Sequence, residues 1–320
     1  MPGFTTHYLF GQQTYQQLHT STLKRTIQKN HTAFCLGLQG PDIFFYDPLS
    51  AVCRIHPGSI THTTSTGSFL KHLLKSPVIF CTKEEQLIAH AYILGFIGHY
   101  LLDAACHPYI YARTHYDCPK KEKKGYLAHH IRLETDIDST LLWFYQRRHP
   151  SEFHQNESIA LSKEQADVIS AALSYAFSNT YSNLHLNRHR ILLAIHAMQK
   201  GTKLLYDPSG RKKLLLRRIE SICPGYPVIS PMIPSDTLLF HKDPCNSRHA
   251  IWQNPWASDH SSSESFFDLF EAAQEEYADI LNAVADFFEK EPSLPEAETA
   301  LEKLSASLGK RSYHSGLDTL

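Results

Sequence analysis

The feature that most constrains this chain is one long apolar stretch in its first third. Residues 84–107, EEQLIAHAYILGFIGHYLLDAACH, carry almost continuous apolar side chains. A run of this length is too long for a β-strand and suits a buried α-helix. Thr82 and Glu85 just before it have the spacing of a capping box, and Pro108 disfavours the α conformation at His107. The sequence therefore predicts a buried helix that begins after this box and ends near His107.

Most of the remaining chain also shows helical patterns. Residues 126–148 predict a second helix, because apolar residues recur through them at helical spacing. Further helices are expected at 163–180, 187–203, 209–220, 264–290 and near 296–308. Residues 221–262 are rich in Pro, Ser and Asn and predict mostly loop. No repeat and no convincing run of alternating strands is present, so we expect an all-α fold.

Composition limits the classes of partner. Of 320 residues, 42% are hydrophobic and 20% are charged, which is ordinary for a globular protein. The formal net charge of -1 provides no broad basic field, so nucleic acid is not an expected partner. Histidine stands out at 21 residues, and histidine is the commonest metal ligand and a natural general base near neutral pH.

The cysteines and the N-terminal residues give expectations about the compartment. Seven cysteines include no C-x-x-C pair, which argues against a disulfide framework and against a thiolate zinc site. The start, MPGFTTHYLFG, lacks a basic segment followed by an apolar one, so no signal peptide is predicted. No apolar run is expected to reach the ~18–20 residues that span a membrane. We expect a cytoplasmic protein with reduced thiols.

The chemistry-bearing residues fall at helical spacing in two places. His99 and Asp103 lie four residues apart on the long helix, so they share a face and can hold one metal ion, while His107 at the helix end can reach a second. His90, nine residues before His99, lies on the opposite face and is assigned to packing or to a surface hydrogen bond.

His130 and Glu134 form a second pair with the same spacing on the next helix. His129 is rotated away, Asp136 fits a solvated or capping residue, and Asp138 lies on the His130 face as a possible support for the ligands. The structural alternative is a buried His–Asp hydrogen-bonded network. Two pairs on neighbouring helices favour a metal centre, because a carboxylate such as Asp103 is costly to bury without a partner.

With these motifs, the first 145 or so residues resemble the zinc-dependent phospholipase C family. The resemblance rests on MPGFTTHYLFG, LGLQGPDIFFY, SITHTTSTG, GFIGHYLLDAACHPY and HHIRLETDID. It implies an all-helical phospholipase C or zinc nuclease-like bundle that holds two or three zinc ions between helices and hydrolyses phospholipid phosphodiesters. It implies that one zinc is bound by Asp42, His62, His99 and Asp103, a second by His107, His130 and Glu134, and a third by His7 with Asp103 as a bridge.

The chain departs from this family pattern near its N-terminus. In secreted members a processed N-terminal Trp completes the third zinc site, whereas this chain begins Met1-Pro2-Gly3 and has His7 much closer to the terminus. The spacing from Asp103 to His107 is also shorter than in the secreted enzymes. We expect residues 1–150 to form the metal-binding core and residues 151–320 to pack on it as one continuous domain.

Several single residues keep two interpretations. Asp42, expected in a loop after Pro41, is either a ligand or a turn residue. His62, in a Thr/Ser-rich loop, would by itself be an ordinary surface histidine. Trp252, Asn254 and Trp256 form either a substrate wall or packing anchors. The basic stretch RKKLLLRR at 211–218 either touches an anionic membrane surface or is a solvated helix face.

The expected reaction is hydrolysis of a phosphodiester by a zinc-bound water, with Asp42 as the first candidate to accept its proton. The substrate is expected to be a phospholipid or another phosphodiester. The alternatives are a zinc-dependent nuclease or small-molecule phosphodiesterase, and a non-catalytic metal-binding protein. The oligomeric state is not indicated by the sequence.

Overall fold

The computed structural model describes residues 3–116, 125–222, 225–237, 240–290 and 295–319. Within these ranges the fold is almost entirely helical. The helices are α1 (Phe4–Gln17), α2 (Ser21–Lys29), α3 (His31–Gly37), α4 (Pro48–Ala51), α5 (Pro57–Thr63), α6 (Thr66–Lys75), α7 (Lys83–Arg113), α8 (Tyr126–Gln146), α9 (Gln155–Ser158), α10 (Lys163–Thr180), α11 (Arg188–Leu205), α12 (Arg211–Ile222), α13 (Ile229–Met232), α14 (Phe266–Phe288) and α15 (Pro295–Leu308). Short 3-10 helices lie at η1 (Gly40–Phe45), η2 (Ser76–Ile79), η3 (Pro150–Glu152) and η4 (Phe240–Lys242). The predicted all-α class is confirmed.

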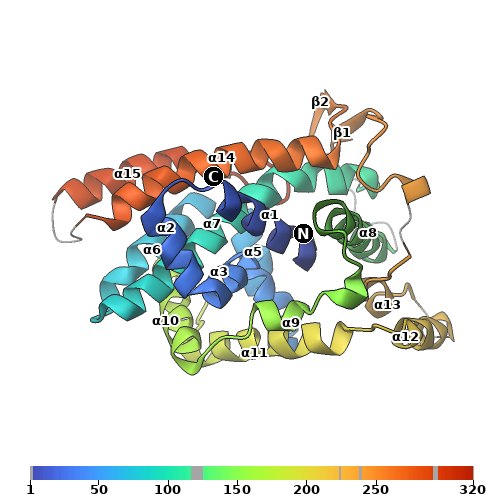
Figure 1. Cartoon of the computed structure of the whole chain (residues 1–320), viewed down its shortest axis with the longest axis horizontal. Coiled ribbons are helices and arrows are strands. Elements are labelled where there is room, and N and C mark those ends of the chain that lie inside the picture. Colours follow the sequence, from blue (N-terminus) through green and yellow to red (C-terminus); the bar gives the residue numbers. More distant parts are fainter. Residues whose placement is uncertain (1–2, 117–124, 223–224, 238–239, 291–294, 320) are drawn as a thin grey trace.

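The long helix α7 is the centre of the molecule, as its apolar sequence predicts. It packs against α1, α3, α10 and α14, and α14 and α15 run along one edge of the bundle while α11 runs along the other (Figure 1). The capping box is confirmed, because the Glu85 backbone N–H donates to Thr82 Oγ1 and the Thr82 backbone N–H donates to Glu85 Oε2. Most residues of α7 are buried, and its apolar side chains form the central part of the shared core.

The predicted end of α7 near His107 is wrong, because the helix continues through Pro108 to Arg113. A proline inside a helix leaves the carbonyl four residues earlier without its usual donor. Here that carbonyl belongs to Ala104, and the C-terminal segment lies against it at Gly316. A Cβ added to Gly316 would lie 2.7 Å from the Ala104 oxygen. Packing of the C-terminal segment around Pro108 therefore stabilises the helix beyond the point where the proline by itself predicts its end.

The expectation that no apolar run is long enough to span a membrane is also wrong. By length and composition α7 passes that test, but 94% of its most apolar window is buried inside the structure. It is the core helix of the bundle.

The 221–262 region contains a short hairpin that the sequence did not indicate. Strand β1 (Trp252–Asn254) pairs antiparallel with β2 (Ala257–Ser262). Trp252 and Trp256 act as packing residues, with Trp252 against Tyr109 and Trp256 against Tyr111. Cys35, Cys53, Cys81, Cys106 and Cys245 are free thiols, while Cys118 and Cys223 lie outside the described residues.

Candidate metal centre

Five elements supply a group of buried histidines and carboxylates. His7 comes from α1, Asp42 from η1 and His62 from α5; the others come from the two long helices α7 and α8. Asp42 and His62 therefore lie in helices rather than in loops, and His62 is fully buried, as a ligand would be, although its local sequence by itself suggests a surface histidine. Pro57 at the start of α5, with His56 as its cap, explains the short helix that carries His62. The structure brings together His7, Asp42, His62, His99, Asp103, His107, His130 and Glu134.

The first cluster joins Asp42, His62 and His99. The Nε2 atom of His62 lies 3.3 Å from Asp42 Oδ1, and the Nε2 atom of His99 lies 3.9 Å from the same oxygen. Asp103 Oδ2 lies 3.4 Å from His62 Nε2 and 3.2 Å from His99 Nε2. Asp42, His62 and His99 thus bring three donor atoms from three separate segments together, and Asp103 Oδ2 lies beside two of them as a further candidate ligand.

A second cluster joins His107, His130 and Glu134. Glu134 Oε1 lies 2.7 Å from His130 Nε2 and 3.9 Å from His107 Nε2. These three residues can hold one ion and leave a position for water or substrate, as catalytic zinc sites do. The four-residue spacings on α7 and α8 place these side chains on facing helix surfaces.

Asp103 connects the first cluster to His7. Its Oδ1 atom lies 3.1 Å from His7 Nε2, whereas its Oδ2 atom faces His62 and His99. The rings of His7 and His99 are stacked with their centroids 4.3 Å apart. A carboxylate with one oxygen on each side has the geometry of a bridge between two ions.

Four of the histidine rings are oriented by oxygen atoms behind them. In each ring Nδ1 contacts an oxygen and Nε2 points into the centre. The partners are Gly58 O for His62 at 2.6 Å, Leu38 O for His99 at 3.1 Å, Tyr313 O for His107 at 2.6 Å and Tyr126 Oη for His130 at 2.7 Å. Such contacts fix the tautomer that presents Nε2 to a metal ion.

The inward-facing atoms lack hydrogen-bond partners among the described residues. This group comprises the Nε2 atoms of His7, His62, His99 and His107, Asp42 Oδ1 and both Asp103 oxygens. Buried polar atoms without partners are costly, and native structures rarely keep so many together. The donor set therefore fits metal ions, whose coordination would satisfy these atoms at once.

Electrostatics in the protein alone agree with this assignment. Burial alone would raise the pKa of Asp103, but the neighbouring imidazoles, His99 first and then His107, hold it well below its usual range. Burial alone would lower the pKa of His62, but the Asp103 and Asp42 carboxylates raise it to about 9. Burial lowers the pKa of His7 and of His107, which favours the neutral imidazole that can ligate a metal. The buried carboxylates thus provide negative charge that a cation would balance.

Glycines allow the backbones around His99 to approach closely. A Cβ on Gly95 would lie 2.1 Å from the Phe34 carbonyl oxygen, and one on Gly37 would lie 2.1 Å from that of Tyr92. This contact between α3 and α7 brings Leu38 O to His99. Gly40, at φ +49°, has the His99 ring where a side chain would be.

Sequence reasoning missed two contributors from the C-terminal segment. The Tyr313 backbone holds both His107 and the backbone carbonyl of His62. The His314 ring lies between the first two clusters, with its centroid 5.5 Å from His62 and 5.7 Å from His107. The only signal in the sequence was the surplus of histidine.

Asp138, expected to support the ligands, has a different role. Its carboxylate accepts hydrogen bonds from the backbone N–H groups of Thr5 and Thr6 and from Thr6 Oγ1, at 3.1, 2.7 and 2.7 Å. It therefore caps α1 from α8 and sets the position of the helix that carries His7. His90 stacks on Phe288 with centroids 3.6 Å apart, which confirms its assignment to packing.

A cleft of about 400 Å³ opens beside the centre. Asp42, His130, Glu134 and His314 line its inner end. Most of its remaining wall is apolar or aromatic and includes Phe45, Tyr46, Tyr111, Tyr126, Leu127, Ile131, Met198, Val228, Met232 and Pro234. The described lining residues include no lysine or arginine.

Fold and donor set together define an all-helical protein with three adjoining candidate metal sites. The chain belongs to the zinc-dependent phospholipase C family, whose family model matches residues 6–201. Comparison with curated proteins and with solved structures gives no match. The family supports zinc as the ion and accounts for the cluster of buried donors.

Proposed function

We propose that this chain is a zinc-dependent hydrolase that cleaves the phosphodiester bond of phospholipids in the manner of a phospholipase C. The observation that carries the proposal is that the candidate metal ligands meet an apolar cleft, because Asp42, His130 and Glu134 line it and the Asp42 Oδ1 atom has no hydrogen-bond partner among the described residues. The donors suit ions that bind a phosphoryl group, and the apolar walls suit the lipid part of the substrate.

Each group of residues has a part in this chemistry. Asp42, His62 and His99, with Asp103 beside them, would hold one ion. His107, His130 and Glu134 would hold a second, and His7 and Asp103, which lie together with His99, a third. Bound zinc supplies a water whose pKa is lowered to about 7 and offsets charge on the phosphoryl oxygens. The Asp42 carboxylate borders both the first cluster and the cleft, so it can take a proton from a water bound there. His314 lies where it can contact the phosphoryl group.

A nuclease on the same centre is the second candidate, but its requirements are poorly met. Single-stranded nucleic acid is held by basic grooves with stacking aromatic residues. Tyr111 and Tyr126 offer aromatic faces, yet the described cleft wall has no cationic side chain. The cleft therefore favours a lipid substrate.

The test is a substrate panel with the zinc-loaded protein. Phosphatidylcholine in mixed micelles, bis-p-nitrophenyl phosphate and single-stranded DNA are compared, and products are identified by ³¹P NMR. We expect diacylglycerol and a phosphorylated head group from the lipid. Asp42→Asn should lower this rate by on the order of 10²-fold or more, whereas the exposed Asp279→Asn on α14 should not. Cleavage of DNA without cleavage of lipid would replace the proposal by the nuclease alternative.

A further inference from the structure

Helix α12 exposes its apolar side chains, although it lies on the surface. None of its residues is buried. Leu214, Leu215, Ile219 and Ile222 are 58, 59, 49 and 85% exposed. At about 100° per residue these four side chains fall within an arc of about 140° on one face. A surface helix normally turns such a face toward the core.

Polar side chains attach the opposite face of α12 to the protein. The Glu220 carboxylate accepts hydrogen bonds from the backbone N–H groups of Val228, Ile229 and Ser230 at 3.0, 2.7 and 3.1 Å. Lys213 Nζ donates to the Ile233 carbonyl at 2.7 Å. The amphipathic pattern is therefore inverted, and the apolar face is held outward by specific bonds.

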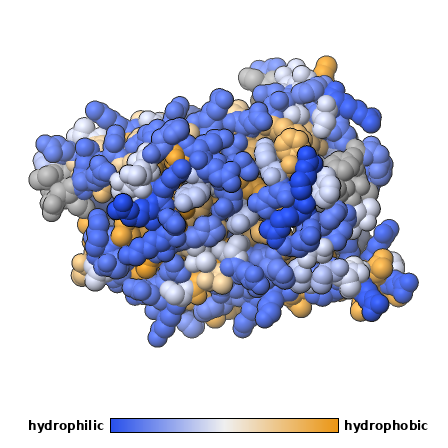
Figure 2. All heavy atoms as spheres, in the orientation of Figure 1, coloured by the Kyte–Doolittle hydropathy of each residue, from blue (hydrophilic) through white to orange (hydrophobic). Residues whose placement is uncertain are grey.

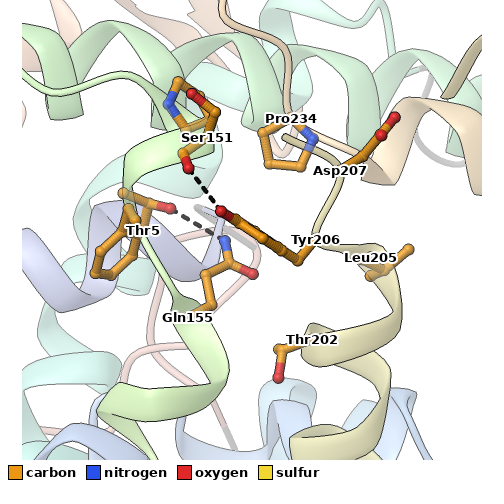
Figure 3. Close-up of a pocket in the computed structure, with 10 residues that line it drawn as sticks. Thr5, Ser151, Gln155, Thr202, Leu205, Tyr206, Asp207 and Pro234 are labelled. Carbon is orange, nitrogen blue, oxygen red and sulfur yellow. Dashed lines mark hydrogen bonds between the residues drawn. The ribbon is translucent and has the colours of Figure 1, made fainter. Parts of the chain in front are cut away.

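The N-terminal end of α12 is fixed as well. Lys212 Nζ donates to the Tyr206 carbonyl at 2.7 Å, and Tyr206 Oη donates to the Ser151 carbonyl at 2.7 Å. Figure 3 shows this second bond beside the one from Gln155 to Thr5 at the start of α1. The outward orientation of α12 is thus tied to the same part of the fold that carries His7.

Cationic side chains accompany the apolar ones. Arg211 and Arg218 lie on the exposed face and Arg217 at its edge, all three exposed. Within the ranges that the structure describes, none of the three forms an ion pair. Hydrophobic atoms lie beside strongly hydrophilic ones at the lower right of Figure 2, where Figure 1 places α12. Exposed apolar groups flanked by free cations complement an anionic bilayer, where lipid tails and head groups meet both needs.

The inner side of α12 is joined to the cleft wall. Glu220 bonds to the backbone at residues 228–230, and this segment forms part of the cleft wall, because Val228 and Met232 line the cleft. Ile229 and Tyr226, 50 and 53% exposed, extend the apolar surface, and Leu127 on α8, 53% exposed, is part of the cleft wall. The helix that carries the exposed apolar face is therefore bonded directly to a segment of the cleft wall.

We propose that α12 docks the protein on anionic lipid bilayers, with Leu214, Leu215, Ile219 and Ile222 inserted between head groups and the arginines on their phosphates. The inference deepens the proposed function, because it names the surface through which the enzyme would reach its lipid substrate. It rests on the proposed function only for that role, since docking itself requires no catalysis. Docking is measured without turnover, so the two can fail separately.

The experiment is co-sedimentation of the full-length metal-loaded protein with large vesicles, either of phosphatidylcholine alone or with phosphatidylserine, at low and high salt. Leu215→Asn with Ile222→Asn should weaken binding by on the order of tenfold per side chain. Arg217→Gln with Arg218→Gln should weaken binding to anionic vesicles by roughly fivefold per charge. Ile251→Asn, 79% exposed next to the hairpin, is the matched control and should bind as wild type.

Hydrolysis of bis-p-nitrophenyl phosphate and zinc content should be unchanged in all these variants, which separates docking from catalysis. The proposal is overturned if the wild type does not bind anionic vesicles, or if the α12 variants bind as well as the control. It is equally overturned if the protein is a dimer in solution that the α12 variants dissociate, because the face would then be covered by a second copy.

Discussion

Replacing Asp138 by Asn should loosen α1 and, with it, the His7 side of the centre. The ionised carboxylate accepts three hydrogen bonds at the start of α1 and is only 5% exposed. Asparagine keeps one acceptor oxygen, but its amide NH₂ must face one of the donors. A hydrogen bond to a charged group contributes about 1.5–3 kcal/mol, and a carboxylate at a helix N-terminus adds about 0.3–1 kcal/mol. Burial raises the pKa of this carboxyl to about 6, so desolvation offsets part of this gain. At pH 8, where the group is ionised, we therefore expect a loss of about 1–3 kcal/mol in the free energy of unfolding.

The assay combines urea unfolding with zinc analysis during a chelator titration. The ion near His7 should be released at a lower chelator concentration than in wild type. The ions at the other two clusters should be retained, because none of their ligands lies on α1. Asp136→Asn is the control, because that side chain lies near Arg132 and Lys213 instead. The reasoning is refuted if Asp138→Asn changes stability no more than the control, or if it strips all ions together.

Three further predictions follow from the same geometry. His99→Ala and Asp103→Ala should each remove zinc and cost on the order of 3–5 kcal/mol of stability, because each leaves buried charge without a partner; unchanged zinc by elemental analysis would contradict the ligand assignment. His90→Phe should leave zinc content unchanged and should remove part of the acid sensitivity of folding. Burial lowers the pKa of His90 to about 3 from 6.5, so the unfolded chain binds the proton first and stability is lost as pH falls from about 6.5 toward 3. Equal slopes of stability against pH for both proteins would disprove this. His7→Ala should release only the third ion, because the ligands of the other two clusters remain in place; loss of all ions in a chelator titration would refute it.

The sequence predicted the features that depend on neighbouring residues, namely the positions of helices and the faces of their side chains. The length of the apolar run correctly predicted the long helix α7. The four-residue spacings correctly predicted the helix faces that carry His99, Asp103, His130 and Glu134. The end of α7 was misplaced because contacts from Gly316, more than 200 residues away, decide whether Pro108 is tolerated. The roles of Tyr313 and His314 depend on the same segment and leave no local signal.

The positions of His62 and Asp138 show a second kind of limit. His62 is buried because α5 packs under the C-terminal segment, with the Tyr313 backbone N–H on its carbonyl. The phase of α8 placed Asp138 on the correct face, but only the approach of α1 makes it a helix cap rather than a support for the ligands. Which of two plausible partners a polar residue meets is decided by tertiary contact.

The most direct test of the central claim is anomalous diffraction at the zinc edge from crystals of the zinc-loaded protein. The account predicts peaks among Asp42, His62 and His99 and among His107, His130 and Glu134, with a weaker peak beside His7. Crystals that show no peak at these clusters, with the Nε2 atoms hydrogen-bonded to carboxylates or water instead, would contradict it.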